Sequence, residues 1–181
     1  MKAIFLDRDG VINRYPGDTK YVTTWKEFRF LPRAKKAVAK LHKNGFKIFV
    51  VSNQAGVGKG ILSRETLNSI TERMLEAVEK SQGKIDDVYY CTHLQDENCS
   101  CRKPKAGLID IAKKHYHIDL KNSFFIGDTV RDVKTAKTAG CKSILVLCGK
   151  EKLSNRKNWE LQPDCVFGNL YKAAEFILSQ K

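Results

Sequence analysis

The chain has 181 residues, of which 42% are hydrophobic, and a formal net charge of +13. This length supports one substantial core, so we expect a single domain over residues 1–181. No apolar run reaches the length of a membrane span, and the segment before Asp7 is too short and too charged for a signal peptide, so we expect a cytoplasmic protein with no membrane partner. The lysines are dispersed without interleaved aromatic residues, which favours a solvated basic surface that attracts a small anionic substrate over one that binds nucleic acid.

Apolar runs typical of buried strands alternate along the chain with patterns typical of amphipathic helices. We expect strands at residues 2–6, 46–51, 87–91, 123–126 and 143–147, with a short sixth strand at 164–167. Helices are expected at 33–44, 63–78, 107–116 and 170–178, with a further helix that ends at 139, an irregular loop at 13–32 and a glycine-rich turn at 55–60. This alternation predicts an α/β fold, namely a doubly wound, Rossmann-like parallel sheet of five or six strands with helices on both faces.

Each of the first four expected strands ends in a cluster of polar side chains. A D-x-D motif alone is more often a solvated turn, so it is the coincidence of four clusters that predicts a site. Since the carboxyl ends of parallel strands meet at one edge of the sheet, where ligands bind in open α/β folds, we expect the clusters to lie together. They are Asp7 with Asp9, Ser52 with Asn53, Lys103 in a cysteine-rich loop, and Asp128 with Asp132.

These side chains fit a magnesium-dependent phosphoryl-transfer site in which the protein supplies the nucleophile. Two carboxylates and one backbone carbonyl suffice for a Mg²⁺ ion, and the candidates are Asp7, Asp128 and the carbonyl of Asp9. The carboxyl group of Asp9 is then available as general acid toward the leaving oxygen and as general base toward water. The remaining polar groups have binding roles, Ser52 and Asn53 for phosphate oxygens and Lys103 for the charge on Asp7 and the phosphoryl group.

The four motifs resemble those of the haloacid dehalogenase-like phosphohydrolases, in the same order and over residues 2–147. They are D-x-D-G-V at 7–11, the apolar strand that leads to S-N-Q at 52–54, Lys103, and G-D-x-x-x-D at 127–132. The resemblance implies an enzyme that acts through an aspartyl-phosphate. By position it implies Asp7 as nucleophile, Asp9 as acid and base, Ser52 as the phosphate-binding hydroxyl, Lys103 as the motif lysine, Asp128 as magnesium ligand, and Asp132 as a supporting residue.

A second group of residues suits a different metal. Three thiolates and one imidazole within eleven residues fit a closed tetrahedral zinc site; they belong to Cys91, His93, Cys99 and Cys101. A closed site has no open position for water, so we expect the zinc to be structural and to stiffen the loop 91–103, which carries Arg102 and Lys103. The alternative is a set of unrelated free thiols beside a surface histidine. The other three cysteines, Cys141, Cys148 and Cys165, are expected to be buried thiols.

The sequence C-x-H…C-x-C-R-K-P resembles the subgroup that contains D-glycero-D-manno-heptose 1,7-bisphosphate 7-phosphatases and histidinol-phosphate phosphatases. Residues 53–60, N-Q-A-G-V-G-K-G, are similar to the heptose enzymes, whereas the histidinol enzymes usually carry an acid at the position of Ala55. Lys59 and Arg102 supply cationic surroundings that suit a second phosphate. The chain departs from the heptose pattern at Ala55, Lys59 and Thr129.

The resemblance therefore favours a small phosphorylated sugar as substrate, with removal of the 7-phosphate of heptose bisphosphate, and a role in carbohydrate metabolism. Histidinol phosphate is the alternative, followed by a nucleic-acid 3′-phosphatase and by a non-enzymatic zinc and nucleic-acid module. No insertion is large enough for a separate cap domain, so we expect an open site on a monomer, covered by the loops 13–32, 54–61 and 91–103. Tyr21 and Trp25 either stack on the sugar or lie in the core.

Overall fold

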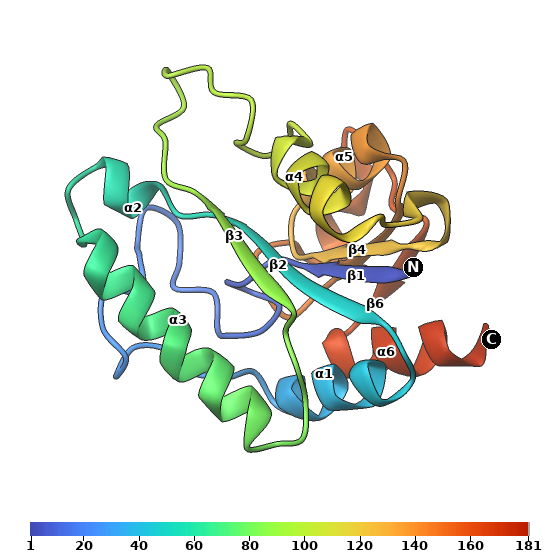
Figure 1. The fold of residues 1–181 in the computed structure, drawn as a ribbon. Helices are drawn as coiled ribbons and strands as arrows, with labels where there is room; N and C mark the ends of the chain where they lie inside the picture. The colour runs from blue at the N-terminus through green and yellow to red at the C-terminus, as the bar shows by residue number, and fades with distance from the viewer. Residues whose placement is uncertain (181) are drawn as a thin grey trace.

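The computed structural model describes residues 1–180, and six of its segments form one parallel sheet (Figure 1). The strands lie in the order β3-β2-β1-β4-β5-β6, so that β1 and β4 are neighbours at the centre. This is the doubly wound order, in which the direction of winding changes between β1 and β4, and it confirms the expected fold class. The strands are β1 (Ala3–Leu6), β2 (Lys47–Asn53), β3 (Asp87–Cys91), β4 (Phe124–Gly127), β5 (Lys142–Val146) and β6 (Cys165–Phe167).

Helices cover both faces of the sheet, as expected. Figure 1 shows α1, α3 and α6 below the strands and α4 and α5 above them, and each layer has its own apolar core. Two short 3₁₀ helices, η1 and η2, were not expected from the sequence. The helices are α1 (Ala34–Lys43), α2 (Ala55–Gly58), α3 (Arg64–Glu79), α4 (Gly107–Tyr116), α5 (Val130–Ala139), α6 (Leu170–Ser179), η1 (Leu120–Asn122) and η2 (Leu153–Asn158).

All four residues of β1 are buried, because helices pack on both faces of this central strand. Ile4 and Leu6 belong to the core beneath α1, α3 and α6, whereas Phe5 belongs to the core beneath α4 and α5. The ring of Phe5 lies 5.6 Å from that of Phe49 and 6.4 Å from that of Phe125, so one aromatic layer joins the three central strands. Burial on both faces explains why the strand is a continuous apolar run in the sequence.

The structure differs from the expectation after the second strand. β2 continues through Ser52 and Asn53, which pair with Tyr90 and Cys91 of β3. The segment expected as a glycine-rich turn contains the one-turn helix α2, in which the N–H of Lys59 donates to the carbonyl of Ala55 at 3.0 Å. A helix this short cannot show an apolar stripe in the sequence, which is why periodicity did not indicate it.

The segment between β1 and α1 is a loop and not a separate cap domain. Within residues 7–33 the structure has isolated bridges but no helix or strand. Trp25 stacks on Phe28 with a ring distance of 5.1 Å, and both pack against the core beneath α1, α3 and α6. Of the two roles left open for Trp25, the structure therefore supports the core. The expectation of a single domain over residues 1–181 stays a prediction. Among the helices of residues 1–180, none combines the length and apolarity needed to cross a membrane.

Asp164 holds the start of β6 against β5, and its removal should destabilise the fold. Its carboxylate accepts from the N–H and hydroxyl of Ser143 at 2.7 and 2.6 Å and lies 2.9 Å from Lys137 Nζ. Burial alone would raise the pKa of Asp164, but the hydrogen bonds from Ser143 and the contact with Lys137 lower it to about 2. Asp164→Ala removes this acceptor from the buried Ser143 groups, but the Asp164 side chain is 46% exposed and solvent screens its contacts, so we expect the free energy of unfolding to fall by about 1 kcal/mol at pH 7.

The pH dependence of this effect has a definite sign. Because the folded pKa of Asp164 is below its unfolded value, its contribution is complete above about pH 4 and is lost as the pH falls toward 2. Urea unfolding at several pH values should show the two proteins converging in that window. Glu72→Ala, which removes an exposed carboxylate from α3, serves as the control and should change the stability by less than about 0.5 kcal/mol. A constant difference between pH 7 and pH 2 would contradict this account.

Candidate active site

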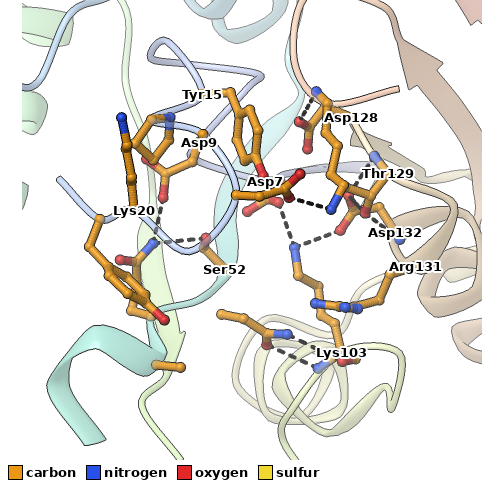
Figure 2. A pocket seen from close by; sticks show the side chains of 18 of the residues that line it. Asp7, Asp9, Tyr15, Lys20, Ser52, Lys103, Asp128, Thr129, Arg131 and Asp132 are labelled. Atoms are coloured by element: carbon orange, nitrogen blue, oxygen red, sulfur yellow. Dashed lines mark hydrogen bonds and ion pairs between the residues drawn. The ribbon is translucent and has the colours of Figure 1, made fainter. Parts of the chain in front are cut away.

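Asp7 and Asp128 follow the carboxyl ends of the two central strands, β1 and β4. Both line a cavity of about 420 Å³ at the edge of the sheet where the winding direction changes. In Figure 2 the side chains of Asp7, Lys103, Asp128 and Asp132 converge, with Asp9 and Ser52 beside them. The sheet topology therefore brings together the polar clusters that the sequence places at four separate strand ends.

Lys103 forms the central ion pairs of this site. Its Nζ lies 2.9 Å from Asp7 Oδ2 and 2.6 Å from Asp132 Oδ1, and the residue is only 3% exposed. Burial would lower the pKa of Lys103, but Asp132 and Asp7 raise it above its ordinary value, so the ammonium stays charged. Asp132 is fixed in turn by Thr129, whose hydroxyl donates to it at 2.6 Å in a capping box at the start of α5.

Asp7 and Asp128 together form a donor set for a divalent cation. One oxygen from each of Asp7, Asp128 and Asp132 lies within 4.8 Å of the other two. The two oxygens of Asp132 contact the side chains of Lys103 and Thr129, which is consistent with its expected supporting role. The family pattern makes Asp7 and Asp128 the expected ligands. Burial raises the pKa of Asp128 well above its ordinary value, and repulsion from Asp7 and Asp132 adds to the effect. A cation between the two carboxylates removes this penalty, and two oxygen ligands plus waters suit Mg²⁺.

The backbone fixes the position of Asp128. The N–H of Lys150 donates to its Oδ2 at 2.7 Å. Gly10 and Gly149 approach so closely that a Cβ atom on either would overlap the Asp128 carboxyl group. Gly10 also has φ +86°, a left-handed conformation that favours glycine. The D-x-D-G turn therefore needs its glycine for two reasons, the turn itself and the room for the Asp128 carboxyl group.

Asp9 lies on the other side of the cavity and accepts hydrogen bonds from three residues. Arg8 Nη2 lies 3.0 Å from Oδ2 and 3.1 Å from Oδ1, Asn13 Nδ2 lies 2.7 Å from Oδ1, and Gln54 Nε2 lies 2.9 Å from Oδ2. Burial would raise the pKa of Asp9, but Arg8 and these amide donors lower it below its ordinary value. We call Arg8, Asn13 and Gln54 the Asp9 donor set. Gln54 Nε2 also lies 3.2 Å from Ser52 Oγ, and dashed lines mark this connection between Asp9 and Ser52 in Figure 2.

The expected phosphate-binding residues occupy different parts of the site. Ser52 is buried at the cavity wall, while both ends of the Asn53 side-chain amide bind the backbone of Lys103, at 3.0 and 3.2 Å. Asn53 therefore positions the lysine, and its phosphate-binding role stays a prediction. Arg102 lines the cavity and donates to the carbonyl of His93 at 3.1 Å. Lys59 lies outside this cavity, in an adjoining groove that Arg102 also lines, with its Nζ 5.7 Å from the ring of Tyr21.

The four expected zinc ligands converge on one point. The sulfur of Cys91 lies 3.6 Å from His93 Nδ1 and 3.6 Å from the sulfur of Cys99. The sulfur of Cys101 lies 3.2 Å from His93 Nδ1 and 3.5 Å from that of Cys99. Edges of about 3.5–3.8 Å follow from zinc bond lengths in a tetrahedron. Three of the four separations lie in this range and the fourth is shorter, so the arrangement is compatible with a Cys₃His site.

Sequence reasoning missed several residues that shape the site. The fifth strand also ends at this edge of the sheet, so Gly149 and Lys150 follow the same rule as the first four clusters and could have been included. Gln54 directly follows the second strand and had the same signal, although no role was assigned to it. Asn13 had no such signal, because a short polar side chain in a loop shows its partner only once the backbone path is known. Arg8 lies between two acids in the sequence, yet it is fully buried on the side away from the cavity.

Comparison with known proteins decides the family. A family model described as HAD-hydrolase-like matches residues 100–173. The D-glycero-beta-D-manno-heptose-1,7-bisphosphate 7-phosphatase of Pseudomonas putida is 38% identical over 150 residues, which cover 83% of this chain and 85% of that protein. The chain belongs to the haloacid dehalogenase-like phosphatases. The expected family and the expected class of enzyme are thereby confirmed.

Two further relatives of this phosphatase bear on its site. The D-glycero-alpha-D-manno-heptose-1,7-bisphosphate 7-phosphatase of Campylobacter jejuni is also 38% identical, over 83% of this chain and 84% of that protein. A crystal structure of the D,D-heptose 1,7-bisphosphate phosphatase from B. bronchiseptica, in complex with magnesium and phosphate, covers 100% of both chains with a TM-score of 0.93 and 32% identity. Magnesium in a structure this similar supports Mg²⁺ as the cofactor of this phosphatase.

Adding one methyl group beside Asp128 should impair this phosphatase. In Gly149→Ala the new Cβ overlaps the Asp128 carboxyl group, so the carboxylate must move and the metal site is distorted. We expect kcat/KM to fall by at least about tenfold and the Mg²⁺ concentration for half-maximal activity to rise. Gly168→Ala is the matched control, because nothing lies within 4 Å of a Cβ at that position. Equal activity of the two variants under a magnesium titration would contradict the geometry.

Proposed function

We propose that this phosphatase removes the 7-phosphate of D-glycero-D-manno-heptose 1,7-bisphosphate through an aspartyl-phosphate on Asp7. The observation that carries the proposal is the convergence of Asp7, Asp128 and Lys103 at the switch point of the sheet, in a chain that resembles heptose bisphosphate phosphatases over most of its length. These relatives include enzymes named for the alpha and for the beta anomer at equal identity, so the proposal covers both anomers.

The reaction divides into two displacements at phosphorus. An oxygen of Asp7 attacks the phosphoryl group, and the bond from phosphorus to the sugar oxygen breaks. Asp9 is ionised in the free site, so it takes up a proton when the anionic substrate binds beside it and then gives that proton to the sugar oxygen. Asp9 then takes a proton from a water molecule, which attacks the aspartyl-phosphate and releases inorganic phosphate and free Asp7. Lys103 and Ser52 bind the phosphoryl oxygens in both steps. When bound, Mg²⁺ neutralises charge on Asp7 and the phosphoryl group.

The rest of the substrate would occupy the groove next to the cavity. The cavity and the groove share Tyr21, Ala55 and Arg102 in their walls, and Lys59 lines the groove alone. A sugar that extends from the reacting phosphate along this groove meets the aromatic ring of Tyr21 first. Its second phosphate then lies near Arg102 and Lys59, whose charges favour an anion there. Ala55 offers no carboxylate for the ammonium group of histidinol phosphate.

A comparison of substrates tests this assignment. We expect kcat/KM to be at least about tenfold higher for heptose 1,7-bisphosphate, in one or both anomers, than for histidinol phosphate or a 3′-phosphorylated oligonucleotide. Asp7→Asn is the control for the mechanism and should lower kcat by at least about 10³-fold while the protein stays folded. A preference for either competing substrate would overturn the substrate class, and turnover by Asp7→Asn would overturn the nucleophile.

We also propose that Cys91, His93, Cys99 and Cys101 bind a structural zinc ion that fixes the loop 91–103. The support is the tetrahedral spacing of the four ligand atoms, together with the tie from Arg102 to the carbonyl of His93. The zinc loop would in this way position Arg102 at the substrate groove and Lys103 at the nucleophile. A single domain over residues 1–181, a cytoplasmic location and a monomeric state complete the proposal; they rest on composition and on the open site.

Loss of this zinc should affect stability and activity together. The purified protein should contain about one zinc ion per chain, and removal by a chelator should lower Tm by at least about 5 °C and reduce turnover. Cys99→Ser should have the same effects, because it removes one ligand. Cys165→Ser, a change outside the cluster, is the control and should leave zinc content and turnover unchanged. A zinc-free protein with unchanged Tm would refute the structural role.

A further inference from the structure

We propose that a cavity between the loop 91–103 and α5 is a second anion site, which binds a free phosphate-type oxyanion beside the reaction centre. This site is separate from the position of the reacting phosphoryl group and from the groove assigned to the sugar. It does not depend on which sugar phosphate the enzyme hydrolyses. The cavity has a volume of about 250 Å³, and its walls are formed by Gln95, Asn98, Cys99, Arg102, Lys103, Pro104, Lys105 and Arg131.

Positive charge dominates the walls of this cavity. Apart from the thiol of Cys99, its ionisable side chains are all cationic, and no carboxylate lines it. Lys103 is neutralised by the two ion pairs described above. Arg102, Lys105 and Arg131 form no ion pair with any carboxylate of residues 1–180. Three positive charges therefore meet at one cavity without a neutralising side chain from the described part of the chain.

Two of these cations are held by backbone carbonyls of the loop 91–103. Arg102 Nη1 donates to the carbonyl of His93 at 3.1 Å, and Lys105 Nζ donates to those of Asn98 and Cys99 at 2.9 and 2.8 Å. Carbonyl groups satisfy N–H donors but carry no net charge, so the repulsion between the cations remains. A zinc ion with three thiolates would carry one net negative charge, which offsets only part of this excess. An oxyanion in the cavity would offset the rest.

The third cation, Arg131, is free to bind a ligand. Its side chain is exposed and lines both this cavity and the reaction cavity. Among residues 1–180 its guanidinium has no hydrogen-bond or ion-pair partner. Glu151 also lines the reaction cavity, but its carboxylate accepts from Trp159 Nε1 at 3.0 Å instead. Figure 2 shows the Arg131 guanidinium extending from α5 toward Lys103. Its planar set of N–H donors matches the oxygens of a phosphate or sulfate ion.

Two helices begin beside the same cavity. Lys105 lies two residues before α4, and Arg131 is the second residue of α5. The positive ends of both helices therefore add to the attraction for an anion. A Cβ atom on Gly107 would lie 2.5 Å from the carbonyl oxygen of Ser100, so the first turn of α4 packs directly against the loop 91–103. This close packing fixes one wall of the second anion site.

The test measures binding of inorganic phosphate to the full chain while its reaction centre is occupied. Beryllium trifluoride with Mg²⁺ is a phosphoryl analogue that binds to a reactive aspartate, and loss of 4-nitrophenyl phosphate hydrolysis verifies that it is in place. Calorimetric titration at constant ionic strength should still show about one phosphate bound per chain. Sulfate, which has a similar shape and charge, should compete with this phosphate, whereas chloride should not.

Variants of α5 locate the bound phosphate. Arg131→Gln removes a charge without removing any side-chain contact of the fold, and it should raise the Kd of this phosphate by at least about tenfold. Arg131→Lys keeps the charge as a single-point donor and should have a smaller effect. Lys134→Gln is the matched control, because Lys134 lies one turn further along α5 and does not line the cavity. It should change the Kd by less than about twofold. In phosphate-free buffer, Arg131→Gln should not lower Tm.

The outcomes separate a defined site from its alternatives. If no phosphate binds while the reaction centre is occupied, the proposal is wrong. Equal weakening by Arg131→Gln and Lys134→Gln would show attraction by net charge alone and would overturn it. A higher KM of Arg131→Gln for a bisphosphate substrate, with unchanged binding of free phosphate, would assign Arg131 to the substrate and would also overturn it. Failure to hydrolyse heptose bisphosphate would refute the proposed substrate and leave this test valid.

Discussion

The repulsion between Asp7 and Asp128 is the constraint on which the rest of the structure depends. Both carboxylates follow central strands, at the point where the sheet changes its direction of winding, and burial makes their negative charges costly. Lys103 compensates part of this charge but is shared with Asp132, which leaves an excess of negative charge that suits a divalent cation. Clustered carboxylates of this kind favour a divalent cation between them.

The residues around Asp7 and Asp128 each fix the position of one functional group of the site. Asn53 fixes the backbone at Lys103, Thr129 fixes Asp132, and the N–H of Lys150 fixes Asp128. Gly10 and Gly149 leave room for the Asp128 carboxyl group, which a Cβ atom at either position would overlap. Most of the polar side chains near the reaction centre therefore serve to hold the few that react, which is how a site with few reacting groups acquires a defined geometry.

The sequence alone predicted the strands and the edge of the sheet at which the acidic side chains meet, because the apolar runs end where the polar clusters begin. Asp7, Asp128 and Lys103 were predicted together because parallel strands present their carboxyl ends at one edge. The spacing of Cys91, His93, Cys99 and Cys101 likewise predicted a cluster whose atoms do converge. The partners of Asp9 could not be predicted. Asn13 depends on where the chain goes after the D-x-D-G turn, and the direction of the Arg8 side chain depends on neighbours distant in the sequence, such as Tyr90.

The absence of a cap between β1 and α1, within the part of the chain that the structure describes, affects how such an enzyme changes its specificity. Three loops with separate supports border the reaction centre: the segment 13–32 on the core beneath α1, the turn at α2, and the loop 91–103 with its thiolates. Each can lengthen or exchange residues without disturbing the sheet, because loops tolerate such changes better than core elements do. Changes confined to these three loops can therefore alter which substrate binds, while the reacting groups at the strand ends stay the same.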